Sequence, residues 1–107
     1  MSDRDAAEAV VCGAGAAGLA AGAMLRRAGV NAFVVDRSDQ VAASWRLRYA
    51  ALRLNTPGWM STMPGYRATL RRYGEFPSRD QWIRYLEDYS AHHRLDLRFG
   101  SEVQRID

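Results

Sequence analysis

The chain has 107 residues, of which 48% are hydrophobic and 25% are charged, so it is one small globular domain or a part of one. All 15 basic residues are arginine, and they are scattered among 12 acidic residues for a net charge of +3, which argues against a nucleic-acid partner. A single cysteine excludes a disulfide framework and a zinc cluster, and it favours a reducing, cytoplasmic setting.

The N-terminal part of the chain has no targeting or membrane pattern. Residues 1–8 (MSDRDAAE) are polar and acidic, unlike a signal peptide. Residues 9–25 carry no charge, but four glycines interrupt them, and the run fits a strand, a turn and a helix better than a membrane span. We therefore expect no membrane partner.

Residues 8–36 (EAVVCGAGAAGLAAGAMLRRAGVNAFVVD) have the pattern of a complete strand, turn, helix and strand. The apolar run at residues 9–12 predicts the first strand, and residues 31–35 predict a parallel strand covered on both faces. Between them, a glycine turn of the form GxGxxG opens a helix that ends near Gly29, where a left-handed cap is favoured. Such a unit is typical of dinucleotide binding.

Each glycine of the turn has a separate role. Gly13 lets the chain turn sharply out of the strand, Gly15 leaves room for a pyrophosphate, and Gly18 lets the helix pack closely on the sheet. The free N–H groups and the positive dipole end of the helix then face the phosphates, so no lysine is needed. The turn therefore predicts a phosphate-binding loop.

Small side chains dominate the helix that follows, and we expect them to face the strands. They recur at i, i+3 and i+4 spacing and comprise Ala17, Ala20, Ala21, Met24 and Ala28. Cys12, at the end of the first strand, is predicted to be a small buried core residue rather than a reactive thiol.

Asp36 ends the second strand eighteen residues beyond Gly18. This is close to the spacing at which an acidic side chain accepts hydrogen bonds from a ribose. A carboxylate there would repel a 2′-phosphate. The bound nucleotide is therefore predicted to be FAD or NAD and not NADP.

Residues 37–77 are rich in aromatic residues, arginine and turn residues. Pro57-Gly58 and Pro64-Gly65 interrupt the segment, so we expect most of it to be irregular, with one short helix within residues 42–51. A long loop of this kind is costly unless something orders it. A large planar ligand would be one such thing.

A capping box at residues 78–81 (SRDQ) predicts a helix that ends near His92. Asp80 and Arg84 are expected to form an i,i+4 ion pair. His92 and His93 are adjacent and therefore about 100° apart on a helix, a poor geometry for one metal, so we expect surface residues and no metal site. The side chains predicted to form a packing face are Trp82, Tyr85, Leu86 and Tyr89.

Residues 95–99 (LDLRF) predict a third strand, and residues 102–106 an alternating fourth segment. The fold class is therefore α/β, with three strands of a doubly wound parallel sheet in the spatial order 3-2-1, flanking helices and a long aromatic loop insertion. It is incomplete, because whatever would cover the other edge of strand one is missing. We divide residues 1–107 into a dinucleotide-binding unit (1–36), a loop insertion (37–77) and a final helix with strands (78–107).

The chain resembles the N-terminal part of the flavin-containing monooxygenases and their bacterial and plant relatives. The blocks that carry the resemblance cover nearly the whole chain: VVCGAGAAGLAAGAML, VVDRSDQVAASWR, LRLNTP and FPSRDQWIRYLEDYSAHHRLDLRFGSEVQRID. The resemblance implies a Rossmann-like FAD-binding half. One departure is Ala42-Ala43, where such families commonly have a glycine pair, and two methyl groups there could weaken flavin binding.

The resemblance also implies the site residues. Asp36 would contact the adenosine ribose, and Asn55, the candidate catalytic residue, would hydrogen-bond the flavin or the nicotinamide amide without changing its own protonation state. An Asn that only stabilises the turn before Pro57 is the alternative. Arg46, Arg48 and Arg53 are left open between phosphate contacts and surface positions. The remaining residues implied to bind the cofactor are Gly13, Gly15, Ala16, Ala17, Gly18, Ser44, Trp45 and Thr56.

The function that the resemblance implies is NADPH-dependent oxygenation of a small organic substrate through a flavin hydroperoxide. The NADPH site would not lie within this chain, because a second GxGxxG is absent. The alternatives are a truncated, inactive nucleotide-binding fragment or another FAD-dependent oxidoreductase; a disulfide reductase would need a redox cysteine pair after the second strand. We expect the 107-residue chain alone to be inactive. The substrate and the oligomeric state, a homo-oligomer included, stay open.

Overall fold

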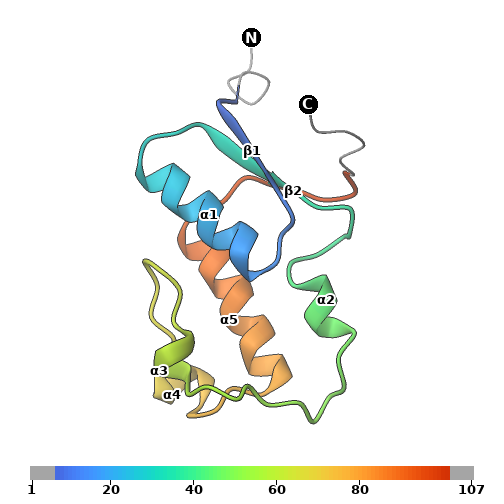
Figure 1. Ribbon diagram of the computed structural model, residues 1–107, viewed down its shortest axis with the longest axis vertical. Coiled ribbons are helices and arrows are strands. Elements are labelled where there is room, and N and C mark those ends of the chain that lie inside the picture. The colour runs from blue at the N-terminus through green and yellow to red at the C-terminus, as the bar shows by residue number, and fades with distance from the viewer. Residues whose placement is uncertain (1–6, 102–107) are drawn as a thin grey trace.

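Three parallel strands form the sheet of the computed structural model, which describes residues 7–101 (Figure 1). They are β1 (Ala9–Cys12), β2 (Ala32–Val35) and β3 (Leu97–Arg98), in the order β1-β2-β3. The predicted order is confirmed, and the third strand is shorter than the sequence pattern indicates. The fourth segment, residues 102–106, lies outside the described residues.

Two long helices, α1 (Ala16–Arg27) and α5 (Arg79–His92), lie side by side against the sheet (Figure 1). Both connect neighbouring parallel strands in the same direction along the sheet, so right-handed crossovers put them on the same face. Three short helices lie near the end of α5 that is farther from the sheet. They are α2 (Ala43–Arg46), α3 (Gly58–Ser61) and α4 (Leu70–Tyr73). Among the described residues, no helix has the length and apolar character that crossing a membrane requires.

Helix α1 faces the sheet through a different stripe from the predicted one. Its buried residues are Leu19, Gly22 and Ala23, whereas Ala17 and Ala21 are exposed. A Cβ on Gly22 would lie 2.9 Å from Cγ2 of Val34 in β2, so the glycine is the point of closest approach. The alanine pattern was ambiguous because small residues surround most of the helix, and the buried Leu19 together with Gly22 marks the face that packs on the sheet.

Cys12 is exposed, so the prediction of a buried core residue was wrong. Side chains alternate along β1: Val11 packs against the core beneath α1, while Val10, 50% exposed, and Cys12 point to the opposite face. The alternation shows that one face of β1 packs against the core and the other is open in the described part of the chain.

The segment 37–77 is more ordered than the sequence predicts. Leu54 N–H donates to Pro77 O at 2.9 Å and Arg79 N–H donates to Leu52 O at 2.9 Å, which pairs this segment with the residues that open α5. The short helix expected within residues 42–51 is present as α2, but α3 and α4 were not predicted. Backbone pairing within the chain contributes to ordering these residues.

Helix α5 begins as predicted. Ser78 Oγ accepts from Gln81 N–H at 3.1 Å, and Gln81 Oε1 accepts from Ser78 N–H at 2.9 Å, which completes the capping box. Its apolar face is buried, with Tyr85, Leu86 and Tyr89 fully inaccessible. The predicted ion pair was wrong: Asp80 pairs with Arg79 at 2.9 Å, and Arg84 faces Asp88 at 3.8 Å.

Replacing the cap tests how much it stabilises the fold. Ser78→Ala is expected to lower the free energy of unfolding by about 1 kcal/mol, because Gln81 N–H loses its acceptor, Ser78 Oγ, at the start of α5. Thr69→Ala is the matched control, since Thr69 caps α4 without a side-chain hydrogen bond. Urea unfolding of both variants measures the difference, and equal midpoints for the two would contradict the assignment.

Candidate dinucleotide site

The glycine turn after β1 has the geometry of a close backbone approach. Gly13 has a φ of +107°, a conformation that favours glycine, and its N–H donates to Val35 O at 2.7 Å. No atom lies within 4 Å of a Cβ built on Gly15, whereas a Cβ on Gly18 would lie 1.8 Å from the Gly13 carbonyl oxygen. Open space therefore adjoins Gly15, and the tight contact lies between Gly18 and Gly13.

The N-terminus of α1 opens from this turn without a side-chain cap. Gly15 is the N-cap residue in extended conformation, and the first turn holds no acidic side chain. The first N–H groups of a helix have no partner within it, so those of Ala16, Ala17 and Gly18 are available to an external acceptor. Together with the helix dipole they form the kind of position that an anionic phosphate occupies.

Asp36 is tied to the glycine turn rather than pointing freely from β2. Its Oδ2 accepts from Ala14 N–H at 2.6 Å, and its Oδ1 accepts from Ser38 N–H at 2.8 Å and Ser38 Oγ–H at 2.7 Å. Ser38 was not predicted as part of the site, although an Asp followed two residues later by Ser is a frequent turn signal. Oδ1 already accepts two hydrogen bonds, whereas Oδ2 accepts one and has a lone pair to spare for a ribose hydroxyl.

The pKa of Asp36 lies below its ordinary value. Partial burial acts to raise it, but the hydrogen bonds from Ala14 and Ser38 favour the charged carboxylate and outweigh that effect. A depressed carboxylate pKa contributes stability that is present above the unfolded-state pKa of 3.8 and is lost as the pH falls through the folded-state pKa.

A pH series checks this contribution. Between about pH 5 and pH 2 the unfolding free energy of the wild type is expected to fall more steeply than that of Asp36→Asn, because the amide cannot gain the proton. Comparing the two removes the background from other acids. If the unfolding free energies of the two proteins fell in parallel with pH, Asp36 would make no such contribution to stability.

The segment that follows β2 returns to the glycine turn. Ala42 N–H donates to Ala14 O at 3.2 Å, and Trp45 N–H donates to Ala42 O at 3.0 Å, so the start of α2 adjoins the turn. Ala42 is 1% exposed and has a φ of 60°, the left-handed conformation that glycine adopts without strain. The alanine at this position therefore stands where a glycine would fit the backbone better, but its methyl group is buried in the core.

The predicted flavin-side residues are exposed, except for the half-buried Trp45. Ser44 is exposed and Trp45 is half-buried, with the Arg48 guanidinium 4.8 Å above the Trp45 ring. Asn55 and Thr56 are exposed beyond the paired segment, and Thr56 Oγ1 shares a 2.7 Å hydrogen bond with Ser61 Oγ. Within the described part of the chain, no hydrogen bond joins Asn55 to the glycine turn.

The arginines near the site have structural partners. Arg46 Nε donates to Val41 O at 3.1 Å and Arg53 Nη1 donates to Phe76 O at 3.0 Å. Arg79, which the sequence did not single out, donates through Nη1 to Arg48 O at 2.7 Å and so fastens the end of α2 to α5. Arg46 and Arg53 therefore each use one guanidinium N–H on a backbone carbonyl, and the choice between phosphate contacts and surface positions stays open.

The described residues fit a dinucleotide at one end and carry no metal cluster. Among them, no group of three or more His, Cys, Asp or Glu side chains is placed to hold a metal ion. His92 is exposed, but His93 is half-buried with its ring 4.5 Å from that of Tyr89, so only one of the pair is a plain surface residue. The open space at Gly15, the unpaired N–H groups of α1 and the adjoining Asp36 carboxylate suit a diphosphate and a ribose.

The chain is similar to known flavoproteins in sequence and in structure. The profile described as pyridine nucleotide-disulphide oxidoreductase matches residues 10–107. Indole-3-pyruvate monooxygenase YUCCA1 of Oryza sativa subsp. japonica is 41% identical over 97 residues, which are 90% of this chain and 24% of that protein. The chain thus spans about a quarter of the length of this curated relative.

Solved structures share the fold. A flavin-containing monooxygenase from Stenotrophomonas maltophilia superposes with a TM-score of 0.84 at 30% identity, over 94% of this chain and 30% of that chain. OTEMO in complex with FAD and NADP superposes with a TM-score of 0.72 at 23% identity, over 92% of this chain and 20% of that chain, which shows the fold alone. The three strands and their helices therefore form a Rossmann-like FAD-binding fold.

Proposed function

The chain belongs to the pyridine nucleotide-disulphide oxidoreductase family, and we propose that it is the FAD-binding portion of an NADPH-dependent flavoprotein monooxygenase. The whole protein would oxygenate a small organic substrate through a flavin hydroperoxide. The observation that carries the proposal is the glycine turn, with open space at Gly15 and unpaired N–H groups at the start of α1. The similarity to named monooxygenases supports the same assignment.

The residues of this chain would bind and orient the cofactor. The N–H groups of Ala16, Ala17 and Gly18 would hold the diphosphate, and Asp36 would accept from the adenosine ribose. When bound, FAD supplies hydride acceptance and oxygen activation, chemistry that no side chain provides. Ser44, Trp45, Asn55 and Thr56 are proposed to line the flavin side, with Asn55 donating or accepting a hydrogen bond at the ring.

The 107-residue chain by itself is proposed to bind FAD without turnover. It spans about a quarter of the length of the monooxygenase relative, and hydride delivery requires a nicotinamide site that its sequence does not provide. We therefore expect flavin to bind to the chain and NADPH oxidation to stay at the level of free FAD. Flavin absorbance and NADPH consumption check both parts, and sustained oxidation by the chain alone would refute the proposed inactivity.

The alternative is another FAD-dependent oxidoreductase of the same family. A disulfide reductase would use a cysteine pair, but the chain has a single cysteine, Cys12, at the end of β1. The redox dithiol of such an enzyme could therefore not lie within this sequence. This observation favours the monooxygenase over the reductase.

A further inference from the structure

Four aromatic rings from three helices form a continuous series of contacts. The Trp45 ring of α2 meets the Trp82 ring of α5 edge-on, with centroids 6.1 Å apart and planes at 70°. Trp82 stacks on Tyr85 at 5.1 Å and 15°, and Tyr85 meets Tyr73 of α4 at 5.2 Å and 90°. The series therefore runs from the segment that adjoins the glycine turn to the far side of α5.

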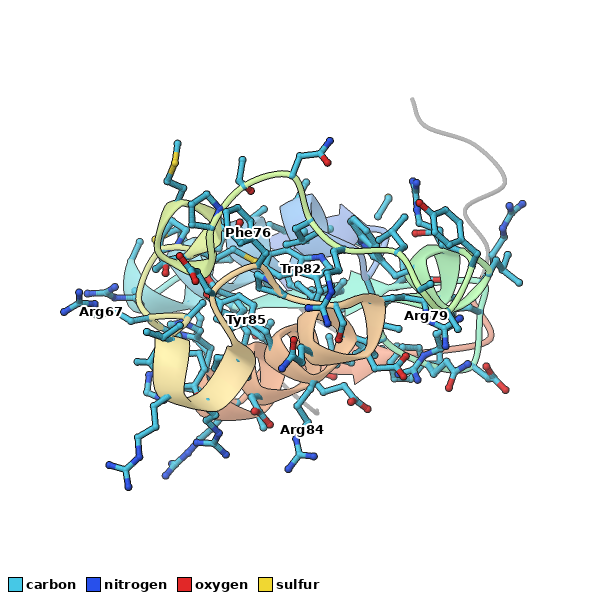
Figure 2. The ribbon with its side chains drawn as sticks, turned by 90° about the horizontal axis from the view of Figure 1, so that it is seen from below. Arg67, Phe76, Arg79, Trp82, Arg84 and Tyr85 are labelled. Atoms are coloured by element: carbon cyan, nitrogen blue, oxygen red, sulfur yellow. The ribbon has the colours of Figure 1, made fainter. Side chains whose placement is uncertain are left out.

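The middle of this series is closed to solvent. Trp82, Tyr85 and Tyr73 are 6%, 0% and 1% exposed, while Trp45 is half-buried. Figure 2 shows Trp82 and Tyr85 together in the interior, whereas Arg84 extends outward from the same helix. Ring contact of this kind contributes packing energy in any core. The two ends of the series distinguish it from packing alone.

At one end, the Tyr73 phenol has a strong proton acceptor. Tyr73 Oη–H donates to Asp88 Oδ2 at 2.7 Å, within the reach that proton transfer requires, and Tyr66 Oη lies 3.1 Å from Tyr73 Oη. The Asp88 carboxylate is partly exposed between Arg72 and Arg84, at 3.7 and 3.8 Å. Burial and the hydrogen bond to Asp88 raise the pKa of Tyr73, so the phenol keeps its proton at rest.

In the middle, Trp82 has no acceptor for its own proton. Its Nε1 is inaccessible and has no hydrogen-bond partner within the described residues. A buried N–H without a partner is uncommon and calls for an explanation. An indole radical cation at Trp82 could not lose its proton there, so it would stay strongly oxidising. Tyr85 likewise donates to a weak base, the Tyr66 carbonyl oxygen, at 2.5 Å.

We propose that Trp45, Trp82, Tyr85 and Tyr73 form an electron-transfer relay. The relay reduces Trp45 again after Trp45 has lost one electron, and it leaves a neutral phenoxyl radical at Tyr73. The oxidant removes one electron from Trp45 and is reduced by it. Trp82 then passes one electron to Trp45, and Tyr73 passes one electron to Trp82 across the Tyr85 ring, which stays in its reduced, protonated form. Tyr73 loses the Oη–H proton to Asp88, so that the net change is one electron to the oxidant and one proton from Tyr73 to Asp88.

The natural oxidant is a photoexcited flavin beside Trp45, and this part rests on the proposed function. The relay would then carry an oxidising equivalent away from the cofactor to a phenol near the surface at Asp88. The series of rings, the proton acceptor and the unpartnered indole do not depend on the cofactor. They are therefore tested with an external oxidant.

Cys12 offers a single attachment point for that oxidant. It is exposed, it is the one cysteine of the sequence, and it precedes the glycine turn to which Ala42 is hydrogen-bonded. A ruthenium polypyridyl photosensitiser is attached to Cys12 and oxidised by a flash in the presence of a sacrificial electron acceptor. The oxidised complex then removes one electron from Trp45. Tyr49→Phe removes a tyrosine for which no ring contact is described, and Trp59→Phe removes the third tryptophan of the sequence, so that the observed signals come from the relay residues and their neighbours.

In this background, transient absorption and electron paramagnetic resonance are expected to show a tyrosyl radical after a short-lived tryptophanyl signal. Tyr73→Phe is expected to leave the tryptophanyl radical as the main product. Asp88→Asn keeps every ring and is expected to slow tyrosyl formation on the order of a hundredfold, because the proton acceptor is lost. Tyr89→Phe is the control, since Tyr89 is equally buried but donates to Pro64 O.

Unchanged tyrosyl formation in both Tyr73→Phe and Asp88→Asn would overturn the relay, as would an equal loss in Tyr89→Phe. Circular dichroism confirms that each variant is folded, and Asp88→Asn decides the question if Tyr73→Phe does not fold. Illumination of the FAD-loaded chain is a separate arm. A radical with ruthenium and none with FAD would retain the relay and contradict the placement of the flavin beside Trp45.

Discussion

Replacing Gly15 with valine is expected to weaken flavin binding strongly while leaving the fold intact. Gly15 has an ordinary φ of −86° and no atom within 4 Å of a built Cβ, so the free chain accepts a side chain there without strain. The same space would be taken by the pyrophosphate. A valine would displace it from the N–H groups at the start of α1, where charge-assisted hydrogen bonds form.

The expected loss is on the order of a hundredfold in affinity for FAD, equivalent to about 2.8 kcal/mol. Titration of FAD by its fluorescence measures the affinity, and urea unfolding measures the stability. Ala21→Val is the matched control, because Ala21 is exposed on α1 away from the turn and gains the same side chain. Equal affinity of Gly15→Val and the wild type would show that the diphosphate does not lie at this glycine.

Gly18→Ala, in contrast to Gly15→Val, is expected to disrupt the fold. A Cβ at this position would lie 1.8 Å from the oxygen and 2.9 Å from the carbon of the Gly13 carbonyl, and backbone atoms cannot move aside cheaply. The helix would have to separate from the turn. We expect a loss of about 3 kcal/mol or more in the free energy of unfolding, a large part of the roughly 5–15 kcal/mol that stabilises a typical domain.

Gly15→Ala serves as the control for Gly18→Ala, because both variants add one methyl group to the same turn. At Gly15 the methyl meets open space, so stability is expected to stay unchanged or to rise by about 0.5 kcal/mol. Thermal unfolding followed by circular dichroism separates the two. If Gly18→Ala melts with the wild type, the close contact between Gly18 and Gly13 is not a feature of the folded chain.

The elements with a regular signal could be predicted from the sequence. The glycine turn, the strand order and the capping box of α5 each depend on local chemistry, namely the positive φ of Gly13, the parallel crossover and the Ser78–Gln81 exchange. These predictions could be made because few other structures satisfy the same patterns, and the structure confirms them. The resemblance to flavin-containing monooxygenases and the Rossmann-like fold are confirmed as well.

The features of the fold that the sequence did not predict depend on contacts between residues far apart in the chain. Nothing in the alanine-rich sequence of α1 indicates that Gly22 meets Val34, because Ala17 and Ala21 have equally small side chains. The exposure of Cys12 follows from which face of β1 the helices cover, which the apolar run does not encode. Helices α3 and α4 are single turns whose position is fixed by pairing with the residues that open α5.

In the candidate site too, some residues were predicted from the sequence and others were not. The sequence identified the turn and Asp36 because their spacing is fixed by one strand and one helix. It did not indicate that Ala14 and Ser38 would hold the Asp36 carboxylate, nor that Ala42 would bond to Ala14. The flavin-side residues Ser44, Asn55 and Thr56 were implied by resemblance, and their contacts to a cofactor stay predictions.

The most direct test is a titration of the ¹⁵N-labelled chain with FAD, followed by the amide resonances of residues 13–18. We predict that the largest shifts occur at Gly15, Ala16, Ala17 and Gly18, with a smaller shift at Asp36, and that Gly15→Val abolishes them. Shifts confined to other parts of the chain, or none at saturating FAD, would contradict the assignment of this turn to the cofactor.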